Sequence, residues 1–183
     1  MVRRAVMGAA DFKSRPDRLM VPANEFAKGA VPGTRQRVYL LPGQLHASAE
    51  SCRITTILGS CVSICLFDAT RLAGGMNHFL LPISKSAEPG SLRYADHATV
   101  ALLEKMMALG CRLENMTAKI FGGAALFQSA GQYRDSLGAK NVLAAVQMLR
   151  NADIPIVARE TGGKHGRKVI FDTEEGVAWA RRV

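Results

Sequence analysis

Apolar and polar residues alternate over several short segments of this chain, a pattern typical of strands with one buried face. The alternation is clearest at 61–67, where Val62, Ile64 and Leu66 share one face. Further strands are predicted at 38–41, 53–58, 76–81, 118–121, 154–159, 168–171 and 177–181. A turn is predicted at 68–75 and a surface loop, rich in Ser, Gly and Pro, at 83–92.

Two longer segments carry apolar residues at helical spacing, 94–109 and 139–150, and Gly110 marks the end of the first. The resulting order is strands, helix, strand, helix, strands. This order predicts an α+β or mixed α/β domain in which two main helices cover sheet faces.

The first 37 residues differ from the rest. Prolines and glycines interrupt every helical pattern there, and eight of the 24 Lys and Arg residues fall within it. We therefore expect an irregular basic N-terminal arm over 1–37, as a linker or docking tail, and a single domain over 38–183.

Several function classes are disfavoured. The longest charge-free runs, 54–67 and 120–133, are shorter than a membrane span requires, and no secretory signal pattern follows the N-terminus, so a cytoplasmic protein without membrane insertion is expected. The four cysteines lack the spacing of a zinc site, and neither a metal nor a cofactor is predicted.

The net charge of +9 and pI near 9.8 suit an acidic partner. The basic residues are scattered and aromatic residues make up only 6% of the chain, so a solvated basic surface is favoured over a nucleic-acid interface.

Cys61 is a candidate nucleophile because Gly59 and Ser60, directly before it, can form a tight turn whose backbone N–H groups face a developing oxyanion. Free cysteine is nevertheless more often a buried core residue. Cys65 lies on the same predicted strand face as Cys61 and is a rival nucleophile. The residue types alone leave these alternatives open.

A catalytic thiol needs a base, and His78 is the best placed of four histidines. A symmetric hairpin of 61–67 with 76–81 would place His78 opposite Cys65, and a shifted register or a bulge is needed to bring it to Cys61. His97 is expected on a helix surface, His165 in a flexible loop that could contact a ligand, and His46 in a loop.

Six motifs follow one another along the chain, namely Leu58–Val62, Gly75–Pro82, Tyr94–Asp96, Lys119–Ala124, Gly138–Val142 and Thr161–Gly163 followed by Arg167. Together and in this order they resemble the CheD family of chemoreceptor glutamine deamidases. The resemblance covers the chain from about Val38 to the C-terminus.

The resemblance implies a catalytic triad of Cys61, His78 seventeen positions later and Thr55 six positions earlier, and it selects Cys61 over Cys65. Gly59 and Ser60 would contribute to the oxyanion and substrate site. The family fold is a three-layer α/β sandwich similar to the catalytic domain of deamidating bacterial toxins.

The implied reaction is hydrolysis of glutamine side-chain amides on the cytoplasmic helical bundle of methyl-accepting chemoreceptors. The resemblance also raises two further expectations for some family members, hydrolysis of receptor methyl esters and binding of the phosphatase CheC. The alternatives are a non-catalytic adaptor that binds receptor or CheC, a nucleic-acid binder using the basic arm, and a cysteine protease.

Overall fold

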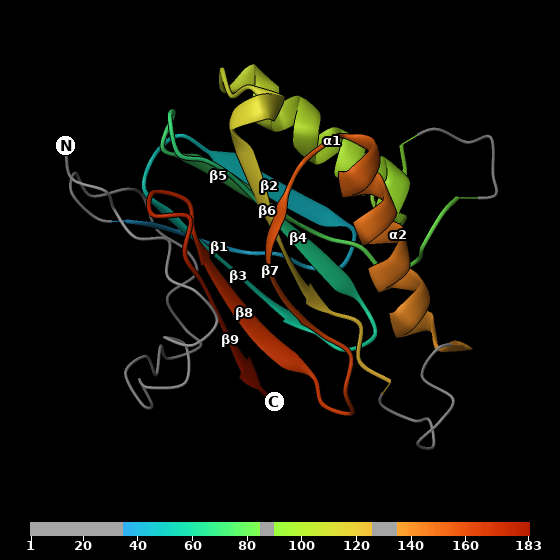
Figure 1. Cartoon of the computed structure of the whole chain (residues 1–183). Helices are drawn as coiled ribbons and strands as arrows, with labels where there is room; N and C mark the ends of the chain where they lie inside the picture. The colour runs from blue at the N-terminus through green and yellow to red at the C-terminus, as the bar shows by residue number, and fades with distance from the viewer. Residues whose placement is uncertain (1–34, 85–89, 126–134) are drawn as a thin grey trace.

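The structure, a computed structural model, describes residues 35–84, 90–125 and 135–183. They form three layers, with one sheet packed on a second sheet and two helices covering the second sheet (Figure 1). The predicted α+β architecture is confirmed. The predicted basic arm lies outside the described residues as far as residue 34.

Sheet A contains four strands in the order β1 (Gln36–Tyr39), β3 (Cys52–Leu58), β8 (Arg167–Asp172) and β9 (Ala178–Arg182). Sheet B contains five in the order β2 (Gln44–Ser48), β5 (Ala73–His78), β4 (Val62–Asp68), β6 (Met116–Gly122) and β7 (Ile156–Thr161). Each sheet is mixed, because β1 is parallel to β3 and β7 is parallel to β6.

The helices are α1 (Ala95–Ala108) and α2 (Leu137–Asn151), and the short 3₁₀ helix η2 (Leu113–Asn115) precedes β6. Both α-helices lie on the side of sheet B away from sheet A (Figure 1). No helix in the described part of the chain is long and apolar enough to cross a membrane.

Two apolar clusters hold the layers together. Ile64 and Leu66 of β4 pack against the helices, whereas Cys65, between them, packs with Met76 and Phe171 in the space between the sheets. The alternation predicted for β4 is therefore confirmed. The central strands β4 and β5 of sheet B are buried on both faces, so polar side chains on either face of them need a hydrogen-bond partner or a function.

The turn predicted at 68–75 is too long, because β5 already begins at Ala73. Gly75 lies inside this strand because neighbouring elements leave no room for a side chain. A Cβ there would lie 2.8 Å from Ala47 Cβ and 2.8 Å from Leu102 Cδ1. Glycine is thus required here by the close packing of β2, β5 and α1, and it does not mark a turn.

Two further boundaries differ from the sequence prediction. His46 lies in β2, paired with Met76, and the prediction of a loop there is wrong. β1 begins at Gln36, two residues before the strand predicted at 38–41. Both strands are short and carry several polar residues, so their apolar pattern is too weak to identify them.

The start of α2 lies directly on the chain that leaves β6. Ser136 caps the helix, its Oγ accepting a hydrogen bond from the Ala139 N–H at 3.0 Å. At Gly138, a Cβ would lie only 2.4 Å from the Gly123 carbonyl oxygen and 2.7 Å from that of Ala124. This contact fixes the position of α2 relative to the end of β6.

We predict that Gly138→Ala destabilises the protein. In a free helix this change stabilises by about 1 kcal/mol, but here the methyl group collides with a backbone carbonyl, so we expect a loss of about 2 kcal/mol or more. Urea denaturation measures the change. Leu143→Ala, at a 68% exposed position of the same helix, is the control, with an expected change within about 0.5 kcal/mol. A stabilised Gly138→Ala variant would contradict the close contact.

Candidate active site where the chain crosses between the sheets

The chain crosses from sheet A to sheet B through three residues, Gly59, Ser60 and Cys61, here called the Cys61 turn. Strand β3 ends just before the turn and β4 begins just after it. Of the four cysteines, all free, Cys61 alone is partly exposed, and the other three are buried. The candidate nucleophile is therefore the one cysteine that is partly exposed to solvent.

All three carbonyls of the Cys61 turn accept hydrogen bonds from one support, formed by the chain after β6 and the start of α2. The donors are Ala124 N to Gly59 O at 2.8 Å, Asn141 Nδ2 to Ser60 O at 3.0 Å, and Gly123 N to Cys61 O at 2.8 Å. In a trans peptide the N–H points away from its C=O. The N–H groups of Ser60 and Cys61 therefore point away from this support.

The end of β6 has to be glycine to approach the Cys61 turn so closely. Gly122 has a φ of +105°, and a Cβ on it would lie 2.2 Å from the Cys61 carbonyl oxygen. No L side chain fits there without moving backbone atoms. The Gly122–Gly123 motif is thus a strand exit shaped against the turn.

The position of His78 follows from the register of β5 against β4. Met76 is paired with Cys65, so the symmetric hairpin with His78 opposite Cys65 is wrong by two residues. The turn before β5 is shorter than predicted, which moves β5 toward the Cys61 end. This is the shifted register that a Cys61–His78 pair requires.

The same register continues to the last pair of the ladder, Val62 and Phe79, whose backbones exchange hydrogen bonds of 3.1 and 3.0 Å. In this register Ser63 is opposite His78, and Cys61 is the diagonal neighbour of His78 on the same face. Diagonal neighbours lie about 7 Å apart along the sheet. Both side chains therefore project from one face of sheet B, the face toward sheet A.

The ring of His78 is held from sheet A. Its Nδ1 lies 2.8 Å from Thr56 Oγ1, and that hydroxyl also donates to the Leu40 carbonyl oxygen at 2.8 Å. A hydroxyl has one proton, and here it goes to the carbonyl, so Nδ1 must be the donor to Thr56. Nε2 then carries the free lone pair. It is buried, with no hydrogen-bond partner among the described residues.

The hydroxyl that contacts His78 belongs to Thr56. The family spacing had implied Thr55 instead. Along β3, Ile54, Thr56 and Leu58 are buried, whereas Thr55 and its neighbours on the other face are partly exposed. Thr55 therefore faces the outer side of sheet A, away from sheet B. The structure brings Cys61 and His78 to one face and adds Thr56 in place of Thr55.

Burial makes both candidate groups electrically neutral at rest. It lowers the pKa of His78 to about 4, against an opposing effect of the Leu40 carbonyl, which favours the protonated ring. Burial also raises the pKa of the Cys61 thiol, and the backbone N–H of Cys61 itself acts in the opposite direction. The resting pair is thus a thiol and a neutral imidazole rather than a thiolate and an imidazolium.

The rival candidates lie elsewhere. Cys65 is fully buried, and burial raises the pKa of its thiol to about 12. His97 contacts the ring of Tyr94 on α1, and His165 is exposed between β7 and β8. In the described ranges, no group of three or more His, Cys, Asp or Glu side chains could hold a metal ion.

A buried arginine, which the sequence shows only as part of a motif, supports the same region. Arg167 donates to the carbonyl oxygens of Gly162 at 2.6 Å and Gly122 at 3.4 Å, and its Nε lies 3.3 Å from a Glu160 carboxylate oxygen. It thereby ties β8 to the glycine that contacts the Cys61 turn.

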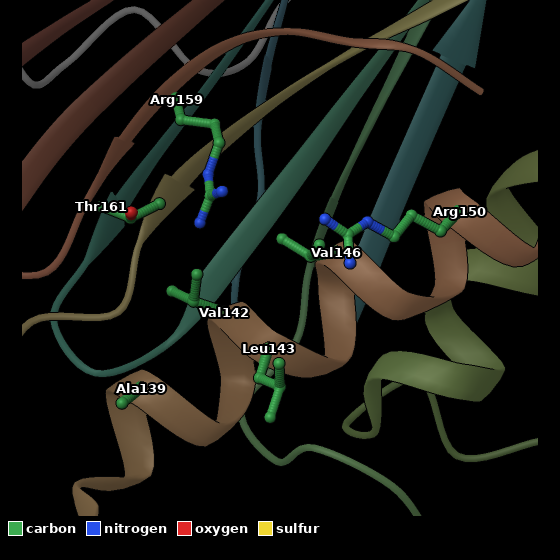
Figure 2. Close-up of a pocket in the computed structure, with 7 residues that line it drawn as sticks. All are labelled: Ala139, Val142, Leu143, Val146, Arg150, Arg159 and Thr161. Atoms are coloured by element: carbon green, nitrogen blue, oxygen red, sulfur yellow. The ribbon is translucent and has the colours of Figure 1, made fainter. Parts of the chain in front are cut away.

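A pocket of about 450 Å³ opens between α2 and β7, on the helix side of sheet B (Figure 2). Val142 and Val146 line it, and the guanidinium group of Arg159 points into it from β7. Neither Cys61 nor His78 lines it. The candidate catalytic groups thus lie outside this pocket, at the edge of the space between the sheets.

The fold and site define an α+β domain with a partly exposed thiol and a buried imidazole on one sheet face, a pair suited to hydrolysis through a thioester. The chain belongs to the CheD family. The model of this family, described as CheD chemotactic sensory transduction, matches residues 80–182.

Similar proteins cover most of the chain. The probable chemoreceptor glutamine deamidase CheD 1 of Anaeromyxobacter dehalogenans is 42% identical over 170 residues, which is 92% of this chain and 95% of the relative. The probable chemoreceptor glutamine deamidase CheD of Trichlorobacter lovleyi is 42% identical over 142 residues, covering 78% and 88% of the two chains. That of Rhodospirillum rubrum is 43% identical over 145 residues, covering 79% and 81%.

Proposed function

We propose that this protein hydrolyses glutamine side-chain amides of chemoreceptors, with Cys61 as nucleophile and His78 as general base. The relatives named chemoreceptor glutamine deamidases support the reaction and the substrate. The observation that carries the assignment of roles is the pair of contacts made by Thr56 Oγ1, with the Leu40 carbonyl oxygen and with His78 Nδ1. We infer from them that Nδ1 carries the proton and that Nε2 is left to accept one.

Nε2 of His78 takes the thiol proton as the Cys61 sulfur attacks the amide carbon of the substrate. The carbonyl oxygen becomes an oxyanion, and the N–H groups of Ser60 and Cys61 are its donors, each worth roughly 3 kcal/mol in comparable sites. The imidazolium returns the proton to the amide nitrogen, the C–N bond breaks, and ammonia leaves. The remaining acyl group is a thioester on Cys61.

Water completes the reaction. His78 removes a proton from the water molecule as its oxygen attacks the thioester, and the imidazolium then protonates the departing sulfur. The products are a glutamate side chain and the original thiol. Thr56 acts throughout by accepting the Nδ1–H bond, which keeps the ring oriented and stabilises its protonated form. Thr56 thus takes the positioning role that the family resemblance assigned to Thr55.

Of the two predicted oxyanion residues, Gly59 and Ser60, we propose this role for Ser60 and not for Gly59. Ser60 contributes its N–H, whereas the carbonyl of Gly59 is held by Ala124 and serves to shape the turn. The partial exposure of Cys61 suits a glutamine side chain projecting from a receptor helix. Hydrolysis of receptor methyl esters would pass through the same thioester. Binding of CheC and the helical-bundle form of the substrate stay predictions.

We predict that Cys61→Ala abolishes conversion of glutamine to glutamate in a purified receptor cytoplasmic fragment, measured by peptide mass spectrometry. The loss should exceed about 10³-fold, because no other thiol replaces the nucleophile. Cys65→Ala is the matched control and should retain activity.

Three outcomes separate the alternatives. Binding without conversion by the wild type would indicate the adaptor. Cleaved receptor backbone would indicate a protease. Activity that survives Cys61→Ala but not Cys65→Ala would show that the nucleophile has been misassigned.

A second prediction compares two adjacent threonines. Thr56→Val removes the acceptor for the His78 Nδ1–H while keeping the side-chain shape, and kcat should fall at least about tenfold, a part of the 10²–10⁴-fold that general base catalysis supplies. Thr55→Val, on the opposite face of the same strand, should leave kcat unchanged and stability within about 0.5 kcal/mol. The reverse result would restore the assignment from the family spacing.

The pKa of His78 makes a third prediction. Protonation of His78 removes the acceptor for the thiol proton, so kcat/KM should fall in acid. Because burial lowers the pKa of His78 to about 4, the fall should be centred near that pH rather than near the ordinary value of about 6.5. Initial rates across pH measure it, with circular dichroism confirming the fold at each pH. An acid limb centred near 6.5 would contradict the buried neutral imidazole.

A further inference from the structure

Asn141 of α2 joins the two segments that carry the proposed catalytic groups. Its side chain is fully buried, and its Nδ2 donates to Ser60 O at 3.0 Å and to Leu80 O at 2.7 Å. One carbonyl belongs to the Cys61 turn and the other follows His78 by two residues. Both hydrogens of the NH₂ group are thereby used.

This bridge lies where the backbone ladder ends. The pairing of β4 with β5 stops at Val62 and Phe79, beyond which Leu80 donates its N–H to Arg93 rather than across to β4. In the continued register, Cys61 would lie opposite Leu80. The Asn141 amide therefore connects the two strands at the point where their own hydrogen bonds cease.

Helix stability does not explain an asparagine at this position. Asn is a poor helix former in a helix interior, and full burial of its amide costs free energy unless every polar atom is paired. The Asn141 Oδ1 is buried without a hydrogen-bond partner among the described residues. What Asn141 contributes at this position is therefore its donor group, which makes hydrogen bonds to two carbonyl oxygens that no apolar side chain could make.

We propose that Asn141 is a positioning residue for the reaction, and that it fixes the plane of the Ser60–Cys61 peptide so that the Cys61 N–H faces the developing oxyanion. The inference rests on the proposed function. A planar peptide has one rotational orientation once its carbonyl oxygen is held. Because Asn141 holds the Ser60 carbonyl oxygen from one side, the Cys61 N–H is directed to the other.

Burial raises the pKa of the Cys61 thiol, and the backbone N–H of Cys61, which lies next to its own sulfur, opposes that effect. This N–H therefore lies on the side from which the sulfur attacks, where the substrate oxygen gains its negative charge. Donors fixed in advance stabilise a transition state more than donors that must reorient during the reaction. Rotation of this one peptide would remove the donor without displacing the sulfur.

The test uses Asn141→Leu, an apolar side chain of similar size. Two rates are compared, deamidation of the receptor fragment and alkylation of Cys61 by iodoacetamide, a displacement that needs no oxyanion donor. We expect kcat for deamidation to fall about 10–100-fold, somewhat less than complete loss of an oxyanion donor. KM and the alkylation rate should stay within about threefold of wild type. Val146→Ala, a buried change on the same helix, is the stability control and should keep kcat.

Two results would overturn the inference. Wild-type kcat in folded Asn141→Leu would show that the amide is only structural. A fall in alkylation that parallels the fall in deamidation would show that Asn141 places the sulfur and not the peptide. If Asn141→Leu does not fold, Asn141→Ser replaces it. The serine hydroxyl can hold one of the two carbonyls, so kcat should fall below that of wild type, but by less than is expected when both hydrogen bonds are lost.

Failure of the proposed function would give a different experimental result. In that case the wild type itself would alkylate at Cys61 and leave receptor glutamines unchanged, which would overturn both proposals. Failure of the inference alone leaves wild-type deamidation intact.

Discussion

The hydrogen bond between Thr56 and His78 is the interaction on which the candidate site depends, because it joins the two sheets at a buried point and fixes which ring nitrogen is free. It requires a polar residue on the inner face of β3 and a histidine on the facing side of β5. The Leu40 carbonyl completes the arrangement by taking the threonine proton. Without that third partner the direction of the bond, and hence the basic nitrogen, would be undetermined.

The candidate nucleophile, Cys61, is positioned in a different way. Cys61 lies on the link between the sheets, and its three-residue turn is held by carbonyl contacts from one side only. Glycine at 122 and 138 lets β6 and α2 approach closely enough to make those contacts. The support occupies the carbonyl side of the turn, so the N–H side remains for a substrate. Close packing and chemistry are therefore achieved by the same residues.

Much of this could be predicted from local patterns. The apolar alternation identified β4, the helical spacing identified α1 and α2, and the Gly59–Ser60 pair identified the turn before Cys61. The apolar alternation in β3 also distinguishes Thr56 from Thr55, because Ile54 and Leu58 define the inner face of the strand and Thr56 lies on that face. A fixed family spacing does not make this distinction. The contacts of Asn141 and the close packing at Gly75 join segments far apart in the chain, which no local pattern encodes.

The crossing between the sheets also limits how such an enzyme can diversify. In many enzymes the reacting groups sit on loops that change while the scaffold stays constant. Here the proposed base His78, its partner Thr56 and the residues that support the Cys61 turn are all buried, so replacing any of them disturbs the packing of the sandwich itself. New preferences among target proteins must therefore arise at the exposed rim around Cys61, leaving the interior almost invariant.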